Sequence, residues 1–474
     1  MNNFKKILFL ISLIISIFFL RNYEYNKLNF FILSIICNAY FIISFSKKVN
    51  LFHIFNSFFL WMGFWFKILI VHTFFDLNFA ELNTQKNYLI FFEESIIVSI
   101  IGISAFLLSS IYNYYCSPLN NFDRKIFNDN QTSDFINRYK NIIIIFFISL
   151  ILIINFINFR YSIYQKGLIG NEEINKYISS IFKWLLIFGL TSLSAVFLFH
   201  SLSRKILSVK FLITALFENF VTSISLLSRG MFVNSMAIFF GIIKYYQFYK
   251  FKNIKKTIFI FLGSFLILFT MSLVLTKELR TKEFFKKSEL ESMNLIVVEK
   301  NFFLDIVETN LREFFHLVSH RFVGFEGVLS VSSYENKDFN FLKKTMIKSK
   351  EKDVIFSKII KKEDIKNTQS LKNSSYFIKV PGIIGYLYYS GSLVFIFLIC
   401  FFIGVSITYF EKIVIKFSNG NILFASLISQ VIAYRLSHFG YMPYNTYLIC
   451  LTIILNLLMI YLFYLVINKL SSSN

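Results

Sequence analysis

Long apolar runs separated by short polar segments make up most of the chain, and this pattern predicts its fold. A helix that crosses a membrane needs about 20 apolar residues, within a range of about 17–25. Runs of this kind recur at residues 7–20, 28–46, 51–72, 95–113, 141–158, 181–200, 211–228, 230–247, 257–276, 381–408, 422–436 and 446–467. In hydrocarbon, a helix satisfies its backbone hydrogen-bonding groups within the segment itself. We therefore predict an all-α, polytopic integral membrane protein with about 12 transmembrane helices.

The basic residues between these runs predict which side of the membrane each segment faces. Lys and Arg gather in cytoplasmic loops, so the clusters of positive charge are placed inside. Such clusters lie at 5–6, 47–48, 204–210 and 250–256. This choice puts both termini in the cytoplasm. It puts the net acidic stretch 76–94 outside, together with the long segment 277–380.

The chain is thus predicted to have three parts: residues 1–276 with nine spans, 277–380 as one extracytoplasmic loop, and 381–474 with three spans. Apolar residues recur with helical spacing over 302–318, which predicts an amphipathic helix on the bilayer surface or over a cavity. The stretch 343–372 is rich in Lys, Asn and Ser and has no such periodicity. We predict a mobile loop there.

Composition supports a membrane protein and narrows its partners. The chain is 56% hydrophobic, whereas soluble domains are about 45–50% apolar. The net charge of +22 comes from Lys and Arg spread over many short loops, with no basic helix interleaved with aromatic residues. This charge is expected to orient the spans and meet anionic membrane lipids, so no nucleic-acid partner is predicted. The 277–380 segment has no cysteine, which excludes a disulfide or a thiolate metal site there.

Arg229 is the most prominent candidate for binding a substrate. It lies in the short stretch Leu227-Ser228-Arg229-Gly230 between two apolar runs, at the predicted outer end of a tight helical hairpin. A guanidinium offers five donors in a planar fork, which suits a phosphate or a diphosphate. An arginine that snorkels to the membrane surface or caps the turn would occupy the same position.

Further cations lie on the predicted outer side. Arg321 begins the stretch 321–328, whose two glycines suit a close backbone approach or the end of a helix. Arg280, Arg312 and Arg435 are the other outward arginines. Several arginines converging on one face would form a strong anion site, whereas a single one would carry little weight.

Candidate bases are His316, His320 and Glu326. The two histidines are four residues apart and can share one helix face, but no HExxH pattern is present and two histidines make half a metal site. No metal is predicted, and one of the three residues is expected to act as a general base. Glu218 lies inside an apolar run, where an acid suggests function or a buried cationic partner. Lys67 is one conceivable partner, although its place near the outer end of its span also fits snorkelling.

The tyrosines Tyr386, Tyr388 and Tyr389 lie in the segment Pro381–Gly391 at the start of a predicted span. Tyrosine is an ordinary residue of the membrane interface. In a carbohydrate enzyme, the same side chains would stack on sugars or hydrogen-bond to them.

Three of these stretches, 226–231, 321–328 and 381–391, resemble the O-antigen polymerases, which are Wzy-type oligosaccharide repeat-unit polymerases, and the related O-antigen ligases. The number of spans, the Ser-Arg-Gly hairpin and the large late outer loop fit the plan of that family. The resemblance implies a glycosyltransferase without metal or cofactor on the outer face of the bacterial plasma membrane. It would build lipopolysaccharide O-antigen or capsule.

What the resemblance implies for substrates is a growing glycan on undecaprenyl diphosphate as the donor and a hydroxyl of another lipid-linked repeat unit as the acceptor. By the motif matches, Arg229 and Arg321 would hold the diphosphate, whereas no motif match fixes the general base. A chain-length regulator and a flippase are the implied protein partners.

Other readings of the sequence stay open. A lipid-linked-oligosaccharide flippase would explain the spans and the interior charges but not an outer loop of about a hundred residues. An O-antigen ligase shares the Ser-Arg-Gly feature and differs in its acceptor. A polyprenyl-phosphate-sugar glycosyltransferase has an acidic first outer loop, whereas residues 21–27 contain Glu24 as their one acid. A scaffold without enzymatic activity is a further alternative.

Overall fold

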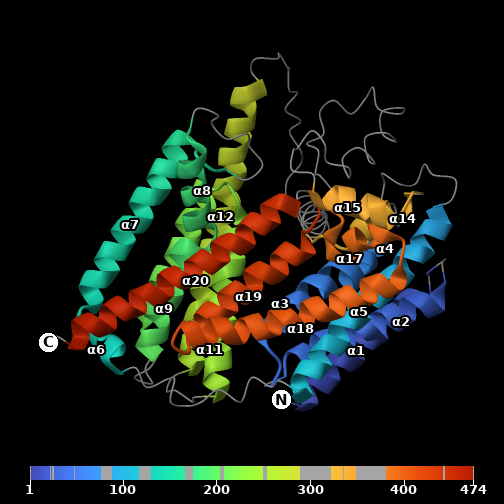
Figure 1. The fold of residues 1–474 in the computed structure, drawn as a ribbon, viewed down its shortest axis with the longest axis horizontal. Helices are drawn as coiled ribbons and strands as arrows, with labels where there is room; N and C mark the ends of the chain where they lie inside the picture. The colour runs from blue at the N-terminus through green and yellow to red at the C-terminus, as the bar shows by residue number, and fades with distance from the viewer. Residues whose placement is uncertain are drawn as a thin grey trace, which may run out of the picture. The chain divides into compact units, whose positions relative to one another are not determined.

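The structure is a computed structural model that describes residues 2–21, 23, 26–46, 48–75, 88–116, 130–165, 174–202, 208–248, 254–288, 322–334, 336–347, 380–440 and 443–472. The regular secondary structure of these residues is helical, with no strand (Figure 1). The elements are α1 (Asn2–Leu20), α2 (Lys27–Ser44), α3 (Leu51–Leu60), η1 (Trp61–Phe66), α4 (Lys67–Phe75), α5 (Tyr88–Cys116), α6 (Asn130–Arg138), α7 (Lys140–Tyr161), α8 (Lys176–Trp184), η4 (Leu185–Gly189), α9 (Leu190–Leu202), α10 (Val209–Ser225), η5 (Arg229–Met231), α11 (Phe232–Phe248), α12 (Ile254–Ser288), α14 (Phe325–Ser332), α15 (Phe339–Ile347), α17 (Gly382–Leu387), η7 (Tyr388–Ser390), α18 (Leu393–Phe417), α19 (Ile422–Ser437) and α20 (Pro443–Ser472).

The predicted all-helical membrane fold is confirmed in the part of the chain that the structure describes. Eight helical stretches there are long and apolar enough to cross a membrane: Lys27–Ser44, Leu51–Thr73, Leu89–Cys116, Lys140–Tyr161, Tyr177–Leu202, Ile254–Arg280, Leu393–Phe417 and Thr446–Val466. Two shorter apolar helices, Ile7–Leu20 and Ile422–Ser437, match the first and eleventh predicted runs. The hairpin helices α10 and α11 have 17 residues each and belong to neither group, so the seventh and eighth predicted spans stay predictions. The total of 12 spans stays a prediction.

The tenth predicted span differs from the observed helices. Residues 381–408 do not form one helix, because α17 and η7 end at Gly391 and α18 begins only at Leu393. Gly391 has a φ of 69°, a left-handed conformation that ends a helix and that glycine adopts without a steric penalty. Gly391 N also donates to Tyr388 O at 2.9 Å, which closes the turn.

The predicted outer loop also contains more helix than expected. The helix α12 continues through 277–288, and α15 covers 339–347, which includes the start of the predicted mobile stretch. Lys343 and Lys344 lie within α15, so the lysine-rich composition did not prevent helix formation there. The amphipathic helix predicted over 302–318 lies outside the described residues.

Contacts divide the chain into two compact units that do not follow its order. Unit 1 contains Met1–Asn121, Lys300–Phe410 and Ile432–Leu451. Unit 2 contains Phe122–Glu299, Glu411–Val431 and Thr452–Asn474. Each unit therefore combines helices from before and after the predicted outer loop.

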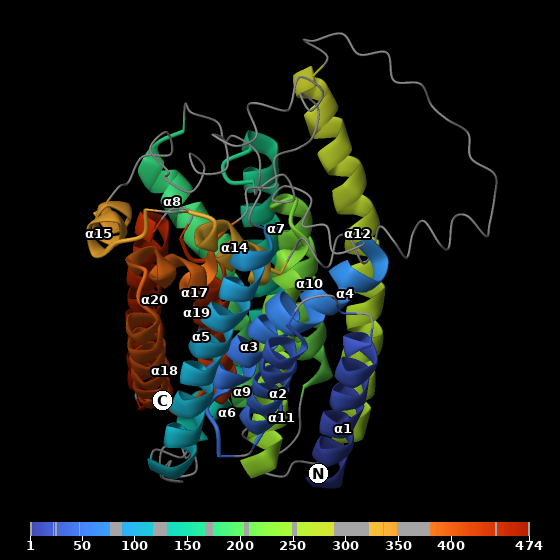
Figure 2. The ribbon, with the colours of Figure 1, turned by 90° about the vertical axis from the view of Figure 1, so that its right-hand side faces the viewer.

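In unit 1, α2 packs against α1, α3 and α5. The elements α14, α15, α17 and η7 gather at one end of this unit, and we call them the cap. Figure 2 shows the cap at the opposite end of unit 1 from the N-terminus of α1. Within the cap, α14 packs on α5 and on α17, and α15 packs on η7. The predicted topology places this end outside the cell.

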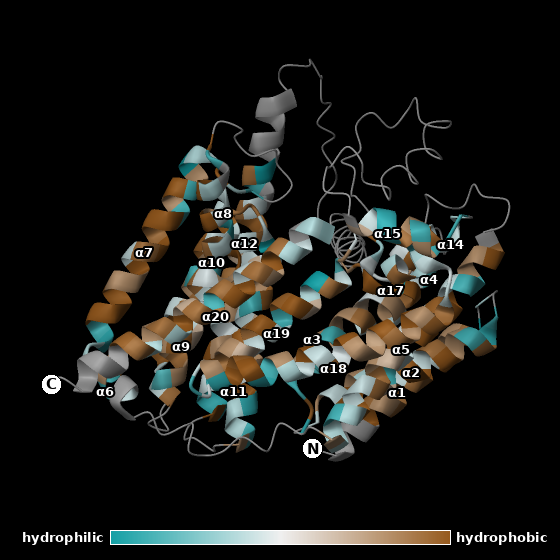
Figure 3. Cartoon of the chain, in the orientation of Figure 1, coloured by the Kyte–Doolittle hydropathy of each residue, from teal (hydrophilic) through white to brown (hydrophobic). Residues whose placement is uncertain are grey.

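In unit 2, α10 is the central helix and contacts α7, α9, α11 and α12. The outward surface of α7 is strongly apolar: Ile145 and Phe156 are 67% and 69% exposed. Figure 3 shows α7 apolar along most of its length. An exposed apolar face of this length suits contact with lipid rather than with water.

Candidate functional site

The Arg229 turn is built by the end of α10. Leu227 has a φ of 51°, which turns the chain away from the helix axis. Ser228 N donates to Ser223 O at 2.9 Å, a bond that spans the last turn. Ser228 Oγ accepts from Gly230 N at 3.4 Å and begins the short 3-10 turn Arg229–Met231. The sequence Ser-Arg-Gly thus forms the tight connection between α10 and α11 that it predicted.

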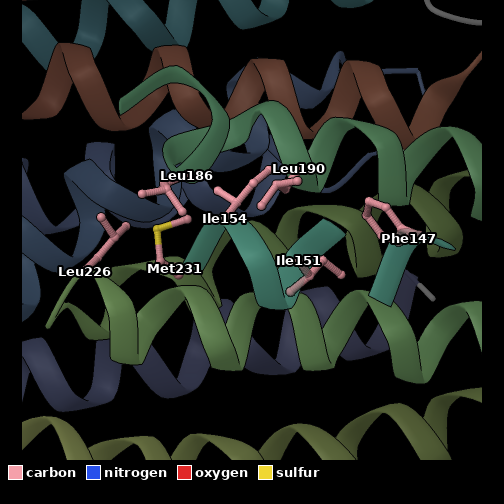
Figure 4. Packing of buried hydrophobic residues seen from close by; sticks show 7 residues of the cluster. All are labelled: Phe147, Ile151, Ile154, Leu186, Leu190, Leu226 and Met231. Atoms are coloured by element: carbon pink, nitrogen blue, oxygen red, sulfur yellow. The ribbon is translucent and has the colours of Figure 1, made fainter. Parts of the chain in front are cut away.

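Apolar side chains on both sides of the turn hold it in place. Leu226 and Met231 are 0% and 2% exposed and belong to one buried cluster of unit 2. Figure 4 shows this cluster, in which Ile154 of α7 and Leu186 of the π-helix η4 take part. A well-packed cluster resists displacement, so it holds the backbone of Arg229 in a fixed position.

The side chain of Arg229 is braced by α12. Its Nε donates to Thr276 Oγ1 at 3.2 Å, and Thr276 Oγ1 donates to Ser272 O at 2.6 Å. Ser272 Oγ in turn lies 2.6 Å from Ser223 Oγ of α10. The bond at Nε fixes the plane of a half-buried guanidinium. Such a fixed fork can bind an oxyanion with two parallel hydrogen bonds.

Arg280 lies on the same helix as Thr276, one turn further along, and is half-buried. Residues four apart on a helix share one face. The structure therefore puts Arg280 on the face of α12 that carries the contact with Arg229. These two predicted diphosphate ligands both belong to unit 2.

Glu218 lies in α10 and is fully buried. Its carboxyl group accepts from Thr191 Oγ1 of α9 at 3.1 Å and from Thr222 Oγ1 at 3.2 Å. Within the described ranges, no lysine or arginine pairs with it. The suggested pairing with Lys67 is wrong, because Lys67 binds another acid.

That acid is Glu326, one of the predicted bases. Lys67 Nζ lies 3.1 Å from Glu326 Oε2, and the two side chains are 2% and 9% exposed. Lys67 Nζ also donates to Phe322 O at 3.0 Å. A buried ion pair needs such additional hydrogen bonds to offset the loss of water. Lys67 therefore does not snorkel but ties the start of α14 to α4.

The backbone around this ion pair is closely fitted. Gly63 lies in the π-helix η1, which ends one residue before Lys67. A Cβ on Gly63 would collide with Val323 O. A Cβ on Gly324 would equally collide with Gly63 O. The glycines of the 321–328 stretch thus serve a close approach, which was one of the two predicted roles. π-Helical turns within α-helices are frequent at functional sites.

The other end of α14 is held by a second lysine. Lys337 Nζ donates to Ser332 O at 2.7 Å and lies 3.0 Å from Glu94 Oε1 of α5. Tyr388 also donates to Glu94. Burial, and next the hydrogen bond with Glu94, raises the pKa of Tyr388, which keeps the phenol protonated as a donor.

The other two predicted sugar-contacting tyrosines lie inside the cap. Tyr386 and Tyr389 are each 1% exposed, and their ring centroids are 5.4 Å apart. Tyr386 Oη lies 2.9 Å from Thr345 Oγ1 of α15, and Tyr389 packs edge-on against Phe341. Their observed contacts are those of core aromatic residues, and their role toward sugars stays a prediction.

A hollow of about 610 Å³ lies beside Glu94 in unit 1. Its lining is Leu89, Ile90, Glu93, Glu94, Ile97, Tyr388 and Leu393. Apolar walls with a few polar groups are typical of sites for amphipathic ligands.

Arg435 lies near the end of α19 in unit 1. Its guanidinium carbon is 5.8 Å from the ring centroid of Tyr434, and its buried Nε has no hydrogen-bond partner among the described residues. The ring of His438 stacks on Tyr434 with centroids 4.1 Å apart. Tyr434 contacts Phe59, which also contacts Phe322. A chain of aromatic contacts therefore links Tyr434, the neighbour of Arg435, to Phe322, which precedes α14.

Four predicted site residues lie outside the described part of the chain: Arg312, His316, His320 and Arg321. Whether arginines converge on one anion therefore stays a prediction. Sequence reasoning missed Glu94, Lys337 and the role of Lys67. The one available signal was Lys67 itself, an ionisable residue inside an apolar run.

Groups of three or more potential metal-ligating side chains are absent from the residues with described positions. Comparisons of the chain with protein-family models, with curated proteins and with solved structures find no match. Function is therefore inferred from the residues of this chain and their geometry.

Proposed function

We propose that this protein polymerises oligosaccharide repeat units carried on undecaprenyl diphosphate, at the outer face of the bacterial plasma membrane. The observation that carries the proposal is the Arg229 turn. The arginine follows the 17-residue helix α10, its backbone is fixed by a buried cluster, and its Nε is bonded to Thr276. This arrangement suits a diphosphate at the level of the lipid headgroups.

In the proposed reaction, a hydroxyl oxygen of the acceptor attacks the anomeric carbon of the donor glycan. The bond between that carbon and the diphosphate oxygen breaks, and the leaving diphosphate takes the electron pair. Arg229 stabilises the charge that develops on this leaving group. The hydroxyl proton passes to a general base.

The hollow beside Glu94 adds a second argument for a lipid-linked saccharide. Leu89 and Ile90 are 63% and 65% exposed on its apolar side, whereas Glu94 and Tyr388 supply polar groups. A substrate with a polyprenyl tail and sugar hydroxyls has matching chemistry.

The proposal is tested on purified protein in liposomes that contain an undecaprenyl-diphosphate-linked repeat unit. Product length, read by gel or mass spectrometry, distinguishes the alternatives. A polymerase gives a ladder of lengths. A ligase forms a new bond only when its separate acceptor is added, and a flippase moves the substrate without forming one.

Arg229→Lys should impair polymerisation nearly as much as Arg229→Ala, by about 10²–10³ in rate. Lysine keeps the charge but loses the planar fork. Arg160→Lys is the matched control, because Arg160 is an exposed arginine of unit 2 at the end of α7. Wild-type ladders from Arg229→Lys at equal protein level would contradict the proposal and favour a turn-capping arginine.

A further inference from the structure

Two lysines of unit 2 reach across the junction at which α7 and α10 begin. Lys210 Nζ donates to Asn141 Oδ1 at 3.3 Å, and Lys140 Nζ lies 5.8 Å from the centre of the Phe211 ring. Each lysine therefore reaches the residue that follows the other lysine in the chain. Because α7 and α10 also pack against each other, this exchange brings the two ammonium groups side by side. We call Lys140 and Lys210 the lysine pair.

No acid forms an ion pair with these lysines in the part of the chain that the structure describes. A third cation, Arg138, ends α6 directly before α7, and its guanidinium carbon lies 5.8 Å from the ring centre of Tyr139. The positive charges of the lysine pair repel each other, and Lys140 is partly buried, so water screens this repulsion only in part. A bound anion would offset the repulsion.

The first turns of α7 and α10 add to the attraction for an anion. A helix begins with backbone N–H groups that have no partner within the helix, and its dipole places partial positive charge there. Neither Tyr139, before α7, nor Ser208, before α10, caps its helix with a side-chain hydrogen bond. The positive ends of two helix dipoles therefore lie beside the lysine pair, an arrangement that favours a phosphate.

The surface next to the lysine pair is apolar and suits an acyl chain. Ile142, Ile145 and Phe146 of α7 are 66%, 67% and 69% exposed. They lie within two turns of Lys140, and the stretch Lys140–Tyr161 is long and apolar enough to cross a membrane. A dissolved phosphate or an acidic peptide would leave this face uncovered. A phospholipid joins a phosphate to acyl chains, so one molecule would contact both the cations and the apolar face.

We propose that the lysine pair binds the phosphate of an anionic phospholipid, whose acyl chains lie along α7. Basic pockets between membrane helices on the cytoplasmic side are typical sites for such head groups. The predicted topology places Lys210 on that side, within the basic cluster 204–210. The inference does not depend on the proposed polymerisation, because the site lies at the opposite end of α10 from the Arg229 turn.

The test measures the unfolding midpoint of the full-length protein, after exchange of its native lipids for a neutral detergent, as dioctanoyl phosphatidylglycerol is added. Binding to the folded protein should raise the midpoint with a saturable concentration dependence. Lys140→Gln/Lys210→Gln removes both charges at a similar side-chain length and should weaken the apparent affinity about tenfold or more. Lys140→Arg/Lys210→Arg keeps the charges and should stay within about threefold of the original affinity.

Lys255→Gln/Lys256→Gln is the matched control. These two exposed lysines also lie at the start of a membrane helix of unit 2, α12. Adjacent residues of a helix do not face each other, so these lysines form no pair, and their loss should change the affinity less than about threefold. If Lys140→Gln/Lys210→Gln does not fold, the single change Lys210→Gln, at an exposed residue, should still weaken binding about threefold or more.

Several results would overturn the lipid site. A midpoint that does not respond to phosphatidylglycerol would reject binding altogether. Equal losses of affinity in the lysine pair and in the control would show that only general surface charge matters. An equal shift with dioctanoyl phosphatidylcholine would show that a net negative head group is not required. An equal shift with inorganic phosphate or with a soluble polyglutamate peptide would assign the cations to a dissolved anion or to an acidic protein segment.

Discussion

Tyr388 donates its phenol hydrogen to Glu94. Removing this hydrogen bond tests whether the side chain stabilises the cap or binds the sugar. If Tyr388 serves the cap, Tyr388→Phe removes a hydrogen bond to a charged acceptor and lowers stability by about 1.5–3 kcal/mol. The KM for the acceptor should then stay unchanged. Thermal unfolding in detergent and the concentration dependence of polymerisation would measure the two effects.

The opposite pattern would assign Tyr388 to the sugar. In that case KM rises severalfold and the unfolding midpoint hardly moves. Tyr386→Phe is a useful comparison, because Tyr386 is 1% exposed and its hydroxyl lies 2.9 Å from Thr345 rather than near a carboxylate. Its loss should cost about 0.5–1.5 kcal/mol, as expected for a neutral hydrogen bond.

Glu218 in unit 2 can likewise serve as a hydrogen-bond acceptor that stabilises the fold or as an ionisable group that the reaction requires. The hydroxyls of Thr191 and Thr222 donate to its carboxyl oxygens, and they can donate equally well to the amide oxygen of a glutamine. We expect Glu218→Gln to keep both the unfolding midpoint and the polymerisation rate. Glu218→Ala leaves the two hydroxyls without this acceptor and should cost about 1–3 kcal/mol. Loss of polymerisation in Glu218→Gln at an unchanged midpoint would show that the ionisable group itself is required.

At the scale of elements, the contact between η1 and the segment before α14 depends on the absence of a side chain at Gly63. Gly63→Ala forces a methyl group into the backbone of Val323 and should destabilise the protein by about 1–3 kcal/mol. The unfolding midpoint in detergent measures this loss, which arises because the two backbones must separate.

Gly263→Ala is the matched control for this prediction. Gly263 lies in α12 and has nothing within 4 Å of the place that a Cβ would take. The change should be neutral or should stabilise the helix by up to about 1 kcal/mol. Equal effects of the two substitutions on stability would show that the close contact at Gly63 does not contribute to the free energy of unfolding.

The helices themselves could be predicted because hydrophobic runs are local in the sequence. Most predicted runs match the observed helices within a few residues. The tenth run failed because a single backbone feature, the left-handed conformation of Gly391, divides it, and hydropathy does not record backbone conformation. The Arg229 turn was predictable for the same reason as the helices, since serine, arginine and glycine adjoin each other between two runs.

At the scale of the whole molecule, the pairings between distant segments could not be predicted. Lys67 and Phe322 are 255 residues apart, and nothing in either local pattern specifies the other. The sequence therefore offered Glu218 as a partner for Lys67, whereas packing in unit 1 supplies Glu326. An ionisable residue within an apolar run can be recognised from the sequence as a buried polar group. Its partner depends on how the helices assemble and cannot be recognised in this way.

The orientation of the molecule in the membrane is the remaining large-scale prediction, and Asn336 and Cys116 test it together. Asn336 follows α14 and is exposed, and Cys116 is an exposed natural cysteine at the end of α5. If the basic clusters face the cytoplasm, a cysteine at 336 lies outside and Cys116 lies inside. An impermeant maleimide should then label Asn336→Cys in intact cells, while Cys116 reacts only after permeabilisation. The Cys450→Ser background removes the other exposed thiol. The reverse order of labelling would place Arg229 and α14 in the cytoplasm, where a polymerase of exported glycans has no substrate.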